Sequence, residues 1–270
     1  MPAILPISDP QDPRIAGFRD IRERDLVGRQ GRFIAEGEVV LRALARAPRH
    51  RAAALLIAQQ RIEALTPLID SFPSETPVYA AGQGVMDAIV GFPIHRGILA
   101  LGERAPECEA GEALSDLADK PRALVLALFG IANHDNMGGL LRNAAAFGVD
   151  LVLLDPTCCD PLYRKAIRVS VGGALLVPFA RLPPGEDPIA LFERHALAAV
   201  ALSPAGRTRL TDLSPPPRAA LLLGAEGPGL PQSLIDRAAS VTIPMSAGFD
   251  SLNVATTSGI ALHHLTAGRR

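Results

Sequence analysis

Apolar and polar residues alternate along the second half of the chain in a way that predicts strands separated by helices. Six short apolar runs have the length and composition of buried strands: Ala123–Phe129, Leu151–Leu154, Ala174–Phe179, Ala198–Leu202, Ala219–Leu223 and Val241–Ile243. The segments between and after them are predicted helices: Gly138–Phe147, Pro161–Val169, Pro188–His195, Pro231–Ala238 and Leu252–Thr266. This alternation predicts an α/β fold in which helices cover both faces of a parallel sheet.

The first half of the chain shows a weaker pattern of the same kind. Helical spacing appears at residues 38–47, and short apolar runs predict strands at Ala53–Ala58, Val78–Ala80 and Gly97–Leu101. The segment Arg104–Lys120 contains Pro, Gly and acidic residues, which is typical of a solvated linker. We therefore expect a small α/β domain at residues 1–103, a linker at 104–120 and a second domain at 121–270.

Composition and charge limit the classes of function. Hydrophobic residues make up 48% of the chain, enough for a buried core, and no apolar run reaches the roughly 18 residues of a membrane span. Residues 1–25 lack the apolar stretch of a signal peptide, so we expect a cytoplasmic protein. The three cysteines and six histidines show no metal-ligand spacing, and we expect no metal.

The net charge of −1 argues against a non-specific polyanion binder, but the charge is unevenly distributed. Between Arg14 and Arg51 there are ten arginines and five acidic residues. The planar guanidinium group is well suited to binding phosphate. This clustering favours an RNA-binding surface, although an arginine-rich chain can also reflect genome composition.

Ligands of parallel sheets bind beyond the carboxyl ends of the strands, so the loops that follow strands are the candidates for a site. The loop after Ala123–Phe129 leads into Asn136, Gly138, Gly139 and Arg142. Asn136 is a good N-cap, and the two glycines leave the first helical turn without side chains. Because helical side chains lean toward the N-terminus, Arg142 should reach back beside Asn136 as an anion-binding group. A capped helix with a solvated Arg is the alternative.

Two later loops have comparable features. The loop after Ala219–Leu223 contains Gly224, Glu226, Gly227 and Gly229, an opened main chain that a ligand can approach, although a plain turn is also possible. The last loop contains Ile243, Met245, Ser251, Leu252 and Asn253. Ser251 could be the N-cap of the final helix, whereas an Asn inside the first turn needs another reason to be there.

Taken together, these loops resemble the SpoU-type (TrmH-type) branch of the SPOUT methyltransferases. The family motifs N-x-G-x-x-x-R, G-x-E-G-x-G and I-P-M followed by S-L-N are matched at Asn136–Arg142, Gly224–Gly229, Ile243–Met245 and Ser251–Asn253. The segment Ser170-Val-Gly-Gly-Ala174 also matches. The motif at residues 31–37 resembles the family's substrate-binding domain, which is similar to ribosomal protein L30e. The chain departs from the family in His134-Asp135, where Pro is common, and in Asn143, where Thr or Ser is common.

The resemblance implies a fold, a reaction and a set of residues. It implies a C-terminal trefoil knot, a homodimer, and methylation of a ribose 2′-hydroxyl in tRNA or rRNA with S-adenosylmethionine as cofactor. The implied catalytic residues are Asn136, Arg142, Glu226, Ser251 and Asn253. The implied cofactor-binding residues are Leu222, Gly224, Gly229, Ile243, Met245 and Leu252.

Two other functions stay open on the residues alone. A nicotinamide-dependent oxidoreductase could use the loop Gly224–Gly229, although the glycine spacing differs from the dinucleotide-binding motif and occurs late in the chain. A non-catalytic RNA-binding factor could retain the fold with a degenerate site. The presence of Asn136, Arg142, Glu226 and Asn253 argues against the latter.

Overall fold

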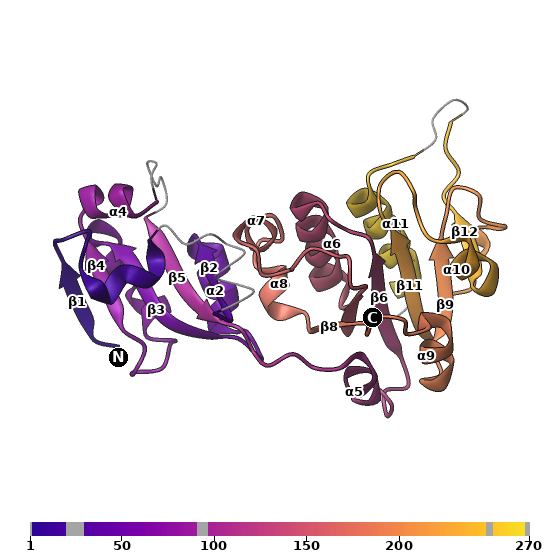
Figure 1. Ribbon diagram of the computed structural model, residues 1–270, viewed down its shortest axis with the longest axis horizontal. Helices are drawn as coiled ribbons and strands as arrows, with labels where there is room; N and C mark the ends of the chain where they lie inside the picture. Colours follow the sequence, from indigo (N-terminus) through magenta and orange to yellow (C-terminus); the bar gives the residue numbers. More distant parts are fainter. Residues whose placement is uncertain (1, 20–29, 91–96, 247–250, 268–270) are drawn as a thin grey trace. The chain divides into compact units, whose positions relative to one another are not determined.

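Buried apolar runs form the strands of two separate sheets in the computed structural model of the protein (Figure 1). The structure describes residues 2–19, 30–90, 97–246 and 251–267. The chain divides into two units, the first made of Met1–Pro106 and Leu162–Leu176 and the second of Glu107–Pro161 and Val177–Arg270. Each unit has its own sheet.

The first unit has a five-stranded mixed sheet in the order β1-β4-β3-β5-β2. The strands are β1 (Ile4–Ile7), β2 (Arg32–Glu36), β3 (Arg51–Ala58), β4 (Val78–Ala81) and β5 (Ile98–Glu103). Strands β1, β4 and β3 are parallel, whereas β5 is antiparallel to both β3 and β2. The helical segments are η1 (Pro13–Phe18), α2 (Glu38–Ala45), η2 (Gln59–Arg61), α3 (Ile62–Ile69) and α4 (Gln83–Val90). The expected strands and the helix at 38–47 are present, and β1 and β2 are additional.

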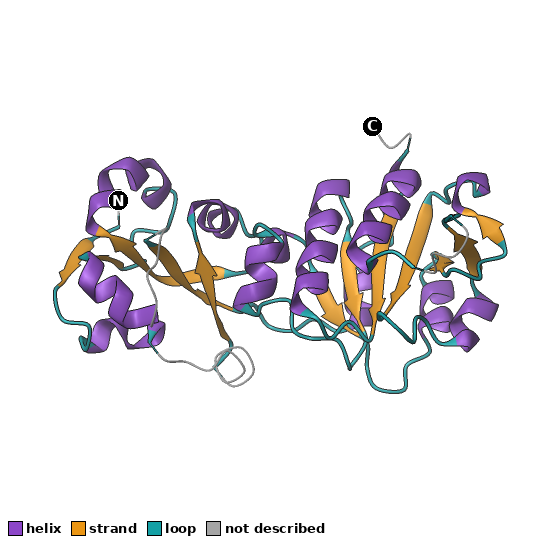
Figure 2. Ribbon diagram, turned by 90° about the horizontal axis from the view of Figure 1, so that it is seen from above, coloured by secondary structure: helices purple, strands orange, loops and turns teal. Residues whose placement is uncertain are grey.

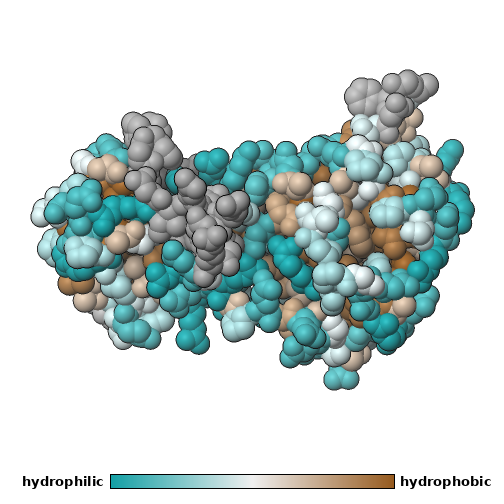
Figure 3. Space-filling model, viewed as in Figure 1, coloured by the Kyte–Doolittle hydropathy of each residue, from teal (hydrophilic) through white to brown (hydrophobic). Residues whose placement is uncertain are grey.

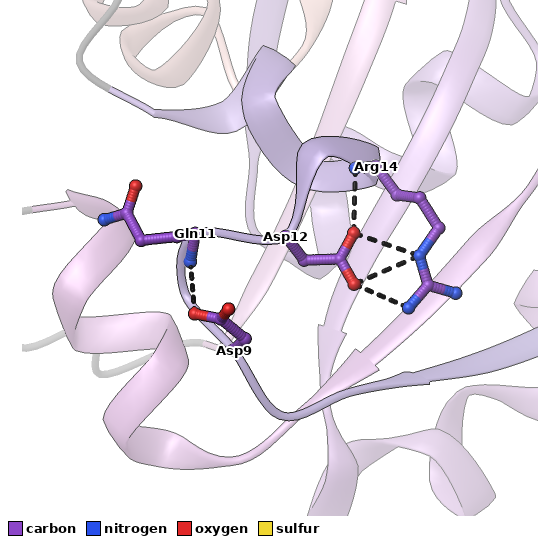
Figure 4. Close-up of polar contacts among 4 residues, drawn as sticks. All are labelled: Asp9, Gln11, Asp12 and Arg14. Atoms are coloured by element: carbon purple, nitrogen blue, oxygen red, sulfur yellow. Dashed lines mark hydrogen bonds and ion pairs between the residues drawn. The ribbon is translucent and has the colours of Figure 1, made fainter.

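Local contacts show why these elements form where they do. Asp12 begins η1 by accepting a hydrogen bond from the backbone N–H of Arg14 at 2.9 Å and pairing with its guanidinium group (Figure 4). Strand β5 needs Gly102, because a Cβ there would lie 2.2 Å from the buried ring of Phe33. The ring of Phe33 in turn packs edge-on against His50.

A segment from the middle of the chain completes the first unit. It contains α7 (Arg164–Val169) and α8 (Gly173–Leu176). Arg164 forms a half-buried ion pair with Glu36 of β2 at 2.8 Å. Gly172, with φ of +83°, approaches α2 so closely that a Cβ would lie 2.5 Å from the Cβ of Ala43. The segment is thus held to α2 and β2 by charge and by close packing.

The second unit contains a seven-stranded sheet in the order β10-β12-β9-β11-β6-β7-β8, and every pairing in it is parallel. Its strands are β6 (Ala123–Phe129), β7 (Leu151–Leu154), β8 (Phe179–Arg181), β9 (Ala198–Leu202), β10 (Thr208–Arg209), β11 (Arg218–Gly224) and β12 (Ala239–Thr242). All seven residues of β6 are buried, as expected for a central parallel strand covered on both faces.

Helices cover both faces of this sheet (Figure 2). One face packs on α5 (Ala110–Ser115), α9 (Pro188–Arg194) and α10 (Gln232–Arg237), whose apolar residues share a core with β6, β7, β9 and β11. The other face carries α6 (His134–Phe147) and α11 (Val254–Thr266), which pack against each other. The short segment η3 (Leu210–Asp212) follows β10. The predicted parallel α/β architecture is therefore confirmed for this unit.

Two expectations from the sequence need correction. Residues 174–179 do not form one strand: Gly173–Leu176 is helical, and β8 begins only at Phe179, after Pro178. The helix is favoured because the Ser170 hydroxyl accepts a hydrogen bond from the backbone N–H of Ala174 at 3.1 Å. The segment 104–120 is more than a linker, because α5 lies within it and its Ala110 and Leu114 are fully buried.

Within the described ranges, no helix combines the length and apolar character needed to cross a bilayer. The same ranges contain no cluster of three side chains suited to holding a metal ion.

Candidate active site

The first site element is the start of α6, where the capping residue is Asn133. Its side chain accepts hydrogen bonds from the backbone N–H groups of Asp135 and Asn136 at 2.7 and 3.3 Å. The prediction that Asn136 caps this helix is therefore wrong, because the backbone is still extended at Asn133 and is already helical at Asn136. Asn136 instead lies in the first turn and is only 8% exposed.

The second element is the start of α11, which is capped by Asn253. The side-chain oxygen of Asn253 accepts from the backbone N–H groups of Ala255 and Thr256 at 2.9 and 3.3 Å. Ser251 is therefore not the cap, and Asn253 precedes the first turn instead of lying within it. Since Asn is among the preferred N-cap residues, this position explains why it stands at the start of a helix.

The same Asn253 side chain joins all three candidate loops. Its Nδ2 atom donates to Asn136 Oδ1 at 2.8 Å and to Glu226 Oε1 at 2.9 Å. An amide group has two N–H donors, so both are used here. The residue thus connects the first turn of α6, the glycine-rich loop after β11 and the start of α11.

This arrangement leaves defined groups for a ligand. Because Asn136 accepts through its oxygen, its own NH2 group remains a donor without a partner among the described residues. Glu226 uses one carboxylate oxygen for Asn253 and keeps the other. The site therefore has one amide donor and one carboxylate acceptor, joined through the side chain of Asn253.

The loop after β11 is shaped by its glycines. A Cβ on Gly224 would lie 2.2 Å from the carbonyl carbon of Gly229, so only glycine permits this approach of the two backbone segments. Gly227 and Gly229 have φ of +91° and +69°, a conformation that other residues rarely adopt. The turn closes with a hydrogen bond from Gly229 N to Ala225 O at 3.0 Å. The result is a loop with few side chains over its main chain.

A cavity of about 670 Å³ opens beside these loops, a size within the usual range for small-molecule sites. It lies at the carboxyl ends of β9, β11 and β12, where apolar residues also reach the surface in Figure 3. Its wall includes the predicted residues Gly224, Glu226, Gly229, Ile243, Met245, Ser251, Leu252 and Asn253. These residues come from two loops that the sequence had placed at the same edge of the sheet.

Three predicted residues do not border the cavity. Leu222 is fully buried in the core of β11, so it is not placed to contact a ligand in the cavity. Asn136 lies behind Asn253, through which it is connected to the cavity wall. Arg142 lies on α6 with an exposed side chain, and no hydrogen bond or ion pair ties it to another described residue.

Sequence reasoning missed part of the cavity wall. Ser203 and Pro204, which follow β9, line it, together with Gln232 and Ile235 of α10 and Thr257 of α11. The loop after β9 could have been found by the same carboxyl-end rule that selected the other loops. The residues on helices gave no comparable signal, because nothing in their sequence pattern distinguishes them from residues of ordinary helix packing.

The cysteines near this edge of the sheet are structural. The Cys158 thiol lies between two backbone groups, near Ile131 N at 3.3 Å and Leu128 O at 3.4 Å. Burial raises the pKa of Cys158 to about 12, so the thiol stays protonated at neutral pH. It therefore does not supply a nucleophile to the site.

Comparisons with known proteins agree with this geometry. Residues 123–263 match the profile of the SpoU rRNA Methylase family. A protein of Mycobacterium tuberculosis named as an uncharacterized tRNA/rRNA methyltransferase is 36% identical over 269 residues, which cover 96% of this chain and 91% of that protein. A 23S rRNA (guanosine-2′-O-)-methyltransferase of Acinetobacter baylyi is 28% identical over 214 residues, which cover 76% of this chain and 83% of that protein.

A solved structure shares the fold. The SpoU methyltransferase AviRb from Streptomyces viridochromogenes, crystallised with S-adenosylmethionine, superposes with a TM-score of 0.78 at 20% identity, covering 96% of this chain and 99% of that chain. The profile match covers more than half of the chain, and the mycobacterial relative covers nearly all of it. On these grounds the chain is an RNA methyltransferase that belongs to the SpoU family.

Proposed function

We propose that this protein transfers a methyl group from S-adenosylmethionine to a ribose 2′-hydroxyl in a structured tRNA or rRNA. The observation that carries the proposal is the Asn253 side chain, which holds Asn136 and Glu226 together at the edge of the cavity. The relative from Acinetobacter baylyi, named as a guanosine-2′-O-methyltransferase of 23S rRNA, supports the choice of the ribose hydroxyl.

The cavity has the features that S-adenosylmethionine requires. Its walls at Gly224 and Gly229 are main chain, which can hydrogen-bond the edge of an adenine, and Leu252 and Ile243 offer apolar surface. Its volume of about 670 Å³ accommodates a ligand of this size. The AviRb structure, which shares this fold, was solved with S-adenosylmethionine. We assign the residues Gly224, Gly229, Ile243, Met245 and Leu252 to cofactor binding.

When bound, the cofactor supplies a methyl group that is already electrophilic, so the protein's task is to align the hydroxyl and remove its proton. Alignment of two reactants can lower the activation barrier by on the order of 7–11 kcal/mol. We assign alignment to the amide of Asn136 and the carboxylate of Glu226, held by Asn253, with Ser251 at the cavity wall. Arg142 would bind the phosphate next to the target ribose, because its guanidinium is exposed and always charged.

The proton of the hydroxyl needs an acceptor. Arg142 is not suited to this role, because a guanidinium group has five N–H donors and no acceptor atom. The second carboxylate oxygen of Glu226, a phosphate oxygen of the RNA or water can each accept it. In every case the methyl group leaves the sulfonium as the oxygen–methyl bond forms, and the net products are a 2′-O-methyl nucleotide, a proton and S-adenosylhomocysteine.

The remaining expectations belong to the same proposal. The first unit, whose strands β2 and β3 begin at Arg32 and Arg51, would bind the RNA as an L30e-like domain.

The chain from β12 to α11 would pass through a trefoil knot, which is consistent with β12 lying two strands away from β11 while α11 packs on α6. The protein would act as a homodimer in the cytoplasm, and sedimentation velocity would measure its mass in solution.

Two experiments test the proposal. Calorimetry with S-adenosylmethionine and with NAD should detect binding of the first alone, whereas binding of NAD alone would favour an oxidoreductase. Methyl transfer to RNA from a strain lacking this gene should then be measured with labelled cofactor. A transcript with a deoxyribose at the target nucleotide should accept no methyl group, since only RNA offers the 2′-hydroxyl.

A further inference from the structure

Helices α6 and α11 lie side by side and run parallel, and their contacts follow one face of each helix (Figures 1 and 2). Going along α6, the contacting residues are Asn136, Gly139, Asn143 and Phe147, and going along α11 with its cap they are Asn253, Ala255, Ser258 and His263. The partners are between 112 and 117 positions apart in the sequence at every step. A nearly constant separation means that the two helices keep one register.

Asn143 makes the hydrogen bonds in the middle of this contact. Its Nδ2 atom donates to the carbonyl oxygen of Ala255 at 2.6 Å and to the hydroxyl of Ser258 at 2.8 Å. Ser258 is fully buried and itself donates to the same carbonyl at 2.7 Å. Asn143 thus uses both amide hydrogens on α11, and it holds the helix at a carbonyl only two residues after Asn253.

Close packing makes this position sensitive. A Cβ on Gly139 would lie 2.6 Å from the Cβ of Ala255, so the two helices are already in direct contact there. Gly259 leaves room for the Asn143 side chain, whose Nδ2 atom lies 3.4 Å from the position that a Cβ on residue 259 would occupy. The two backbones are thus in close contact. We expect the hydrogen bonds of Asn143 to fix the position of α11 along the axis of α6, because apolar packing alone would permit other positions.

Asn143 and Asn136 lie on the same face of α6, because seven residues make almost two full turns. The axial position that Asn143 sets for α11 therefore also sets where the cap residue Asn253 stands relative to Asn136. We propose that Asn143 is a positioning residue of the active site, which acts through α11 to keep Asn253 in reach of Asn136 and Glu226. This rests on the proposed function for its effect on catalysis, but its structural part can be tested separately.

The structural part is tested by the crystal structure of Asn143→Ala. We expect α11 to move along α6, so that Asn253 Nδ2 and Asn136 Oδ1 lie more than 3.5 Å apart. An unchanged distance near 2.8 Å would overturn the proposal, whatever the activity of the protein. The distance can be measured even if the protein methylates no RNA. A failure of the positioning proposal can therefore be told apart from a failure of the proposed function.

The catalytic part is tested by a double-mutant cycle on methyl transfer, measured with S-adenosylmethionine and RNA from a strain lacking this gene. Asn143→Ala should lower kcat by 10- to 100-fold and change the KM for RNA by less than threefold, because misplacement of reacting groups affects the chemical step most. Asn143→Asp, which keeps the shape but offers no donor, should lose as much. Asn143→Ser, which keeps one donor, should be intermediate.

The double variant Asn253→Ala/Asn143→Ala separates positioning of the active site from general stability. If Asn143 acts through Asn253, the double variant should be no slower than Asn253→Ala alone. Losses that multiply would mean that Asn143 acts independently of the site, and the proposal would be wrong. Thr266→Ala is the control: it removes the hydrogen bonds from the Thr266 hydroxyl to the carbonyl oxygens of Leu262 and His263, which lie within α11 and remote from Asn143, and it should leave kcat unchanged.

Discussion

Asn253 Nδ2 lies 2.8 Å from Asn136 Oδ1, although the two residues are 117 positions apart in the chain. The bond exists because two parallel helices begin at the same edge of the sheet, and the cap residue of one meets the first turn of the other. Glu226 joins them from the loop after β11. The side-chain amide of Asn253 therefore has two roles. Its oxygen accepts hydrogen bonds from the first N–H groups of α11, and its nitrogen donates to Asn136 and Glu226.

Two substitutions of Asn253 should separate these roles. Asn253→Asp keeps an oxygen for the backbone N–H groups of Ala255 and Thr256, so the melting temperature should change little. It also places a carboxylate against Glu226 and against the oxygen of Asn136, and methyl transfer should fall by at least 100-fold. Asn253→Ala should lose activity and also about 1 kcal/mol of unfolding free energy, because the cap is gone.

Thermal unfolding and initial rates of methyl transfer, measured on the same preparations, check this pair. If Asn253→Asp were as active as the wild type, the bonds from Nδ2 to Asn136 and Glu226 would have no catalytic role.

Replacement of Arg142 by Ala should abolish methyl transfer while cofactor affinity stays near normal. The side chain is exposed and does not line the cavity, so its removal should change the unfolding free energy by less than about 0.5 kcal/mol. Calorimetry with S-adenosylmethionine and a methylation assay measure the two effects. Arg209→Ala, another exposed arginine of the second unit, is the control and should keep full activity. Comparable loss of binding and of transfer in Arg142→Ala would contradict its assigned role.

Gly224→Ala should weaken cofactor binding by more than tenfold. The added methyl group would lie 2.2 Å from the backbone of Gly229, so the loop must move away from the cavity wall at a cost of about 1–3 kcal/mol. Gly111→Ala is the control, because nothing lies within 4 Å of a Cβ at that helical position and alanine favours a helix. Normal cofactor affinity in Gly224→Ala would show that the loop does not form the binding surface.

Folding stability should decline when the pH rises above about 9. The pKa of Cys158 is raised by burial to about 12 from an ordinary value of 9.0, so the unfolded chain loses this proton before the folded one. The protonated thiol makes its full contribution to the unfolding free energy below pH 9, and this contribution is lost as the pH rises toward 12. At pH 10, one unit above the pKa of the thiol in the unfolded chain, the unfolding free energy should be lower by roughly 1.4 kcal/mol.

Urea unfolding at pH 7 and pH 10 measures this effect, with Cys158→Ser as the comparison because serine does not titrate in this range. The difference between the two pH values should be smaller in Cys158→Ser than in the wild type. Equal differences would show that the Cys158 thiol is not responsible.

The second unit could be predicted from sequence better than the first, for a physical reason. Strands such as β6 are buried on both faces, so they appear as unbroken apolar runs, and the loops at their carboxyl ends could be identified in turn. Strands β1 and β2 of the first unit lie at the two edges of its sheet and alternate in burial, which gives a weaker signal. The strand predicted at residues 174–179 is wrong because an apolar run of six residues fits either a strand or a helix.

The site residues also differ in how far the sequence could predict them. The motifs placed Glu226, Ser251 and Asn253 at one edge of the sheet, but the capping roles of Asn133 and Asn253 depend on where the backbone turns helical, which the sequence alone does not determine. The role of Asn143 was invisible because its partners, Ala255 and Ser258, are more than 110 positions away. The motif alone suggested that Leu222 contacts the cofactor, and its burial in β11 could be seen only in the folded chain.

The proposed function is tested most directly by finding which atom of the RNA receives the methyl group. RNA from a strain lacking this gene should be incubated with the protein and S-adenosylmethionine carrying a labelled methyl group, digested to nucleosides and separated by mass spectrometry. The label should appear in a single 2′-O-methyl nucleoside. Label in a base-methylated nucleoside, or no transfer to any RNA by protein that binds the cofactor, would contradict it.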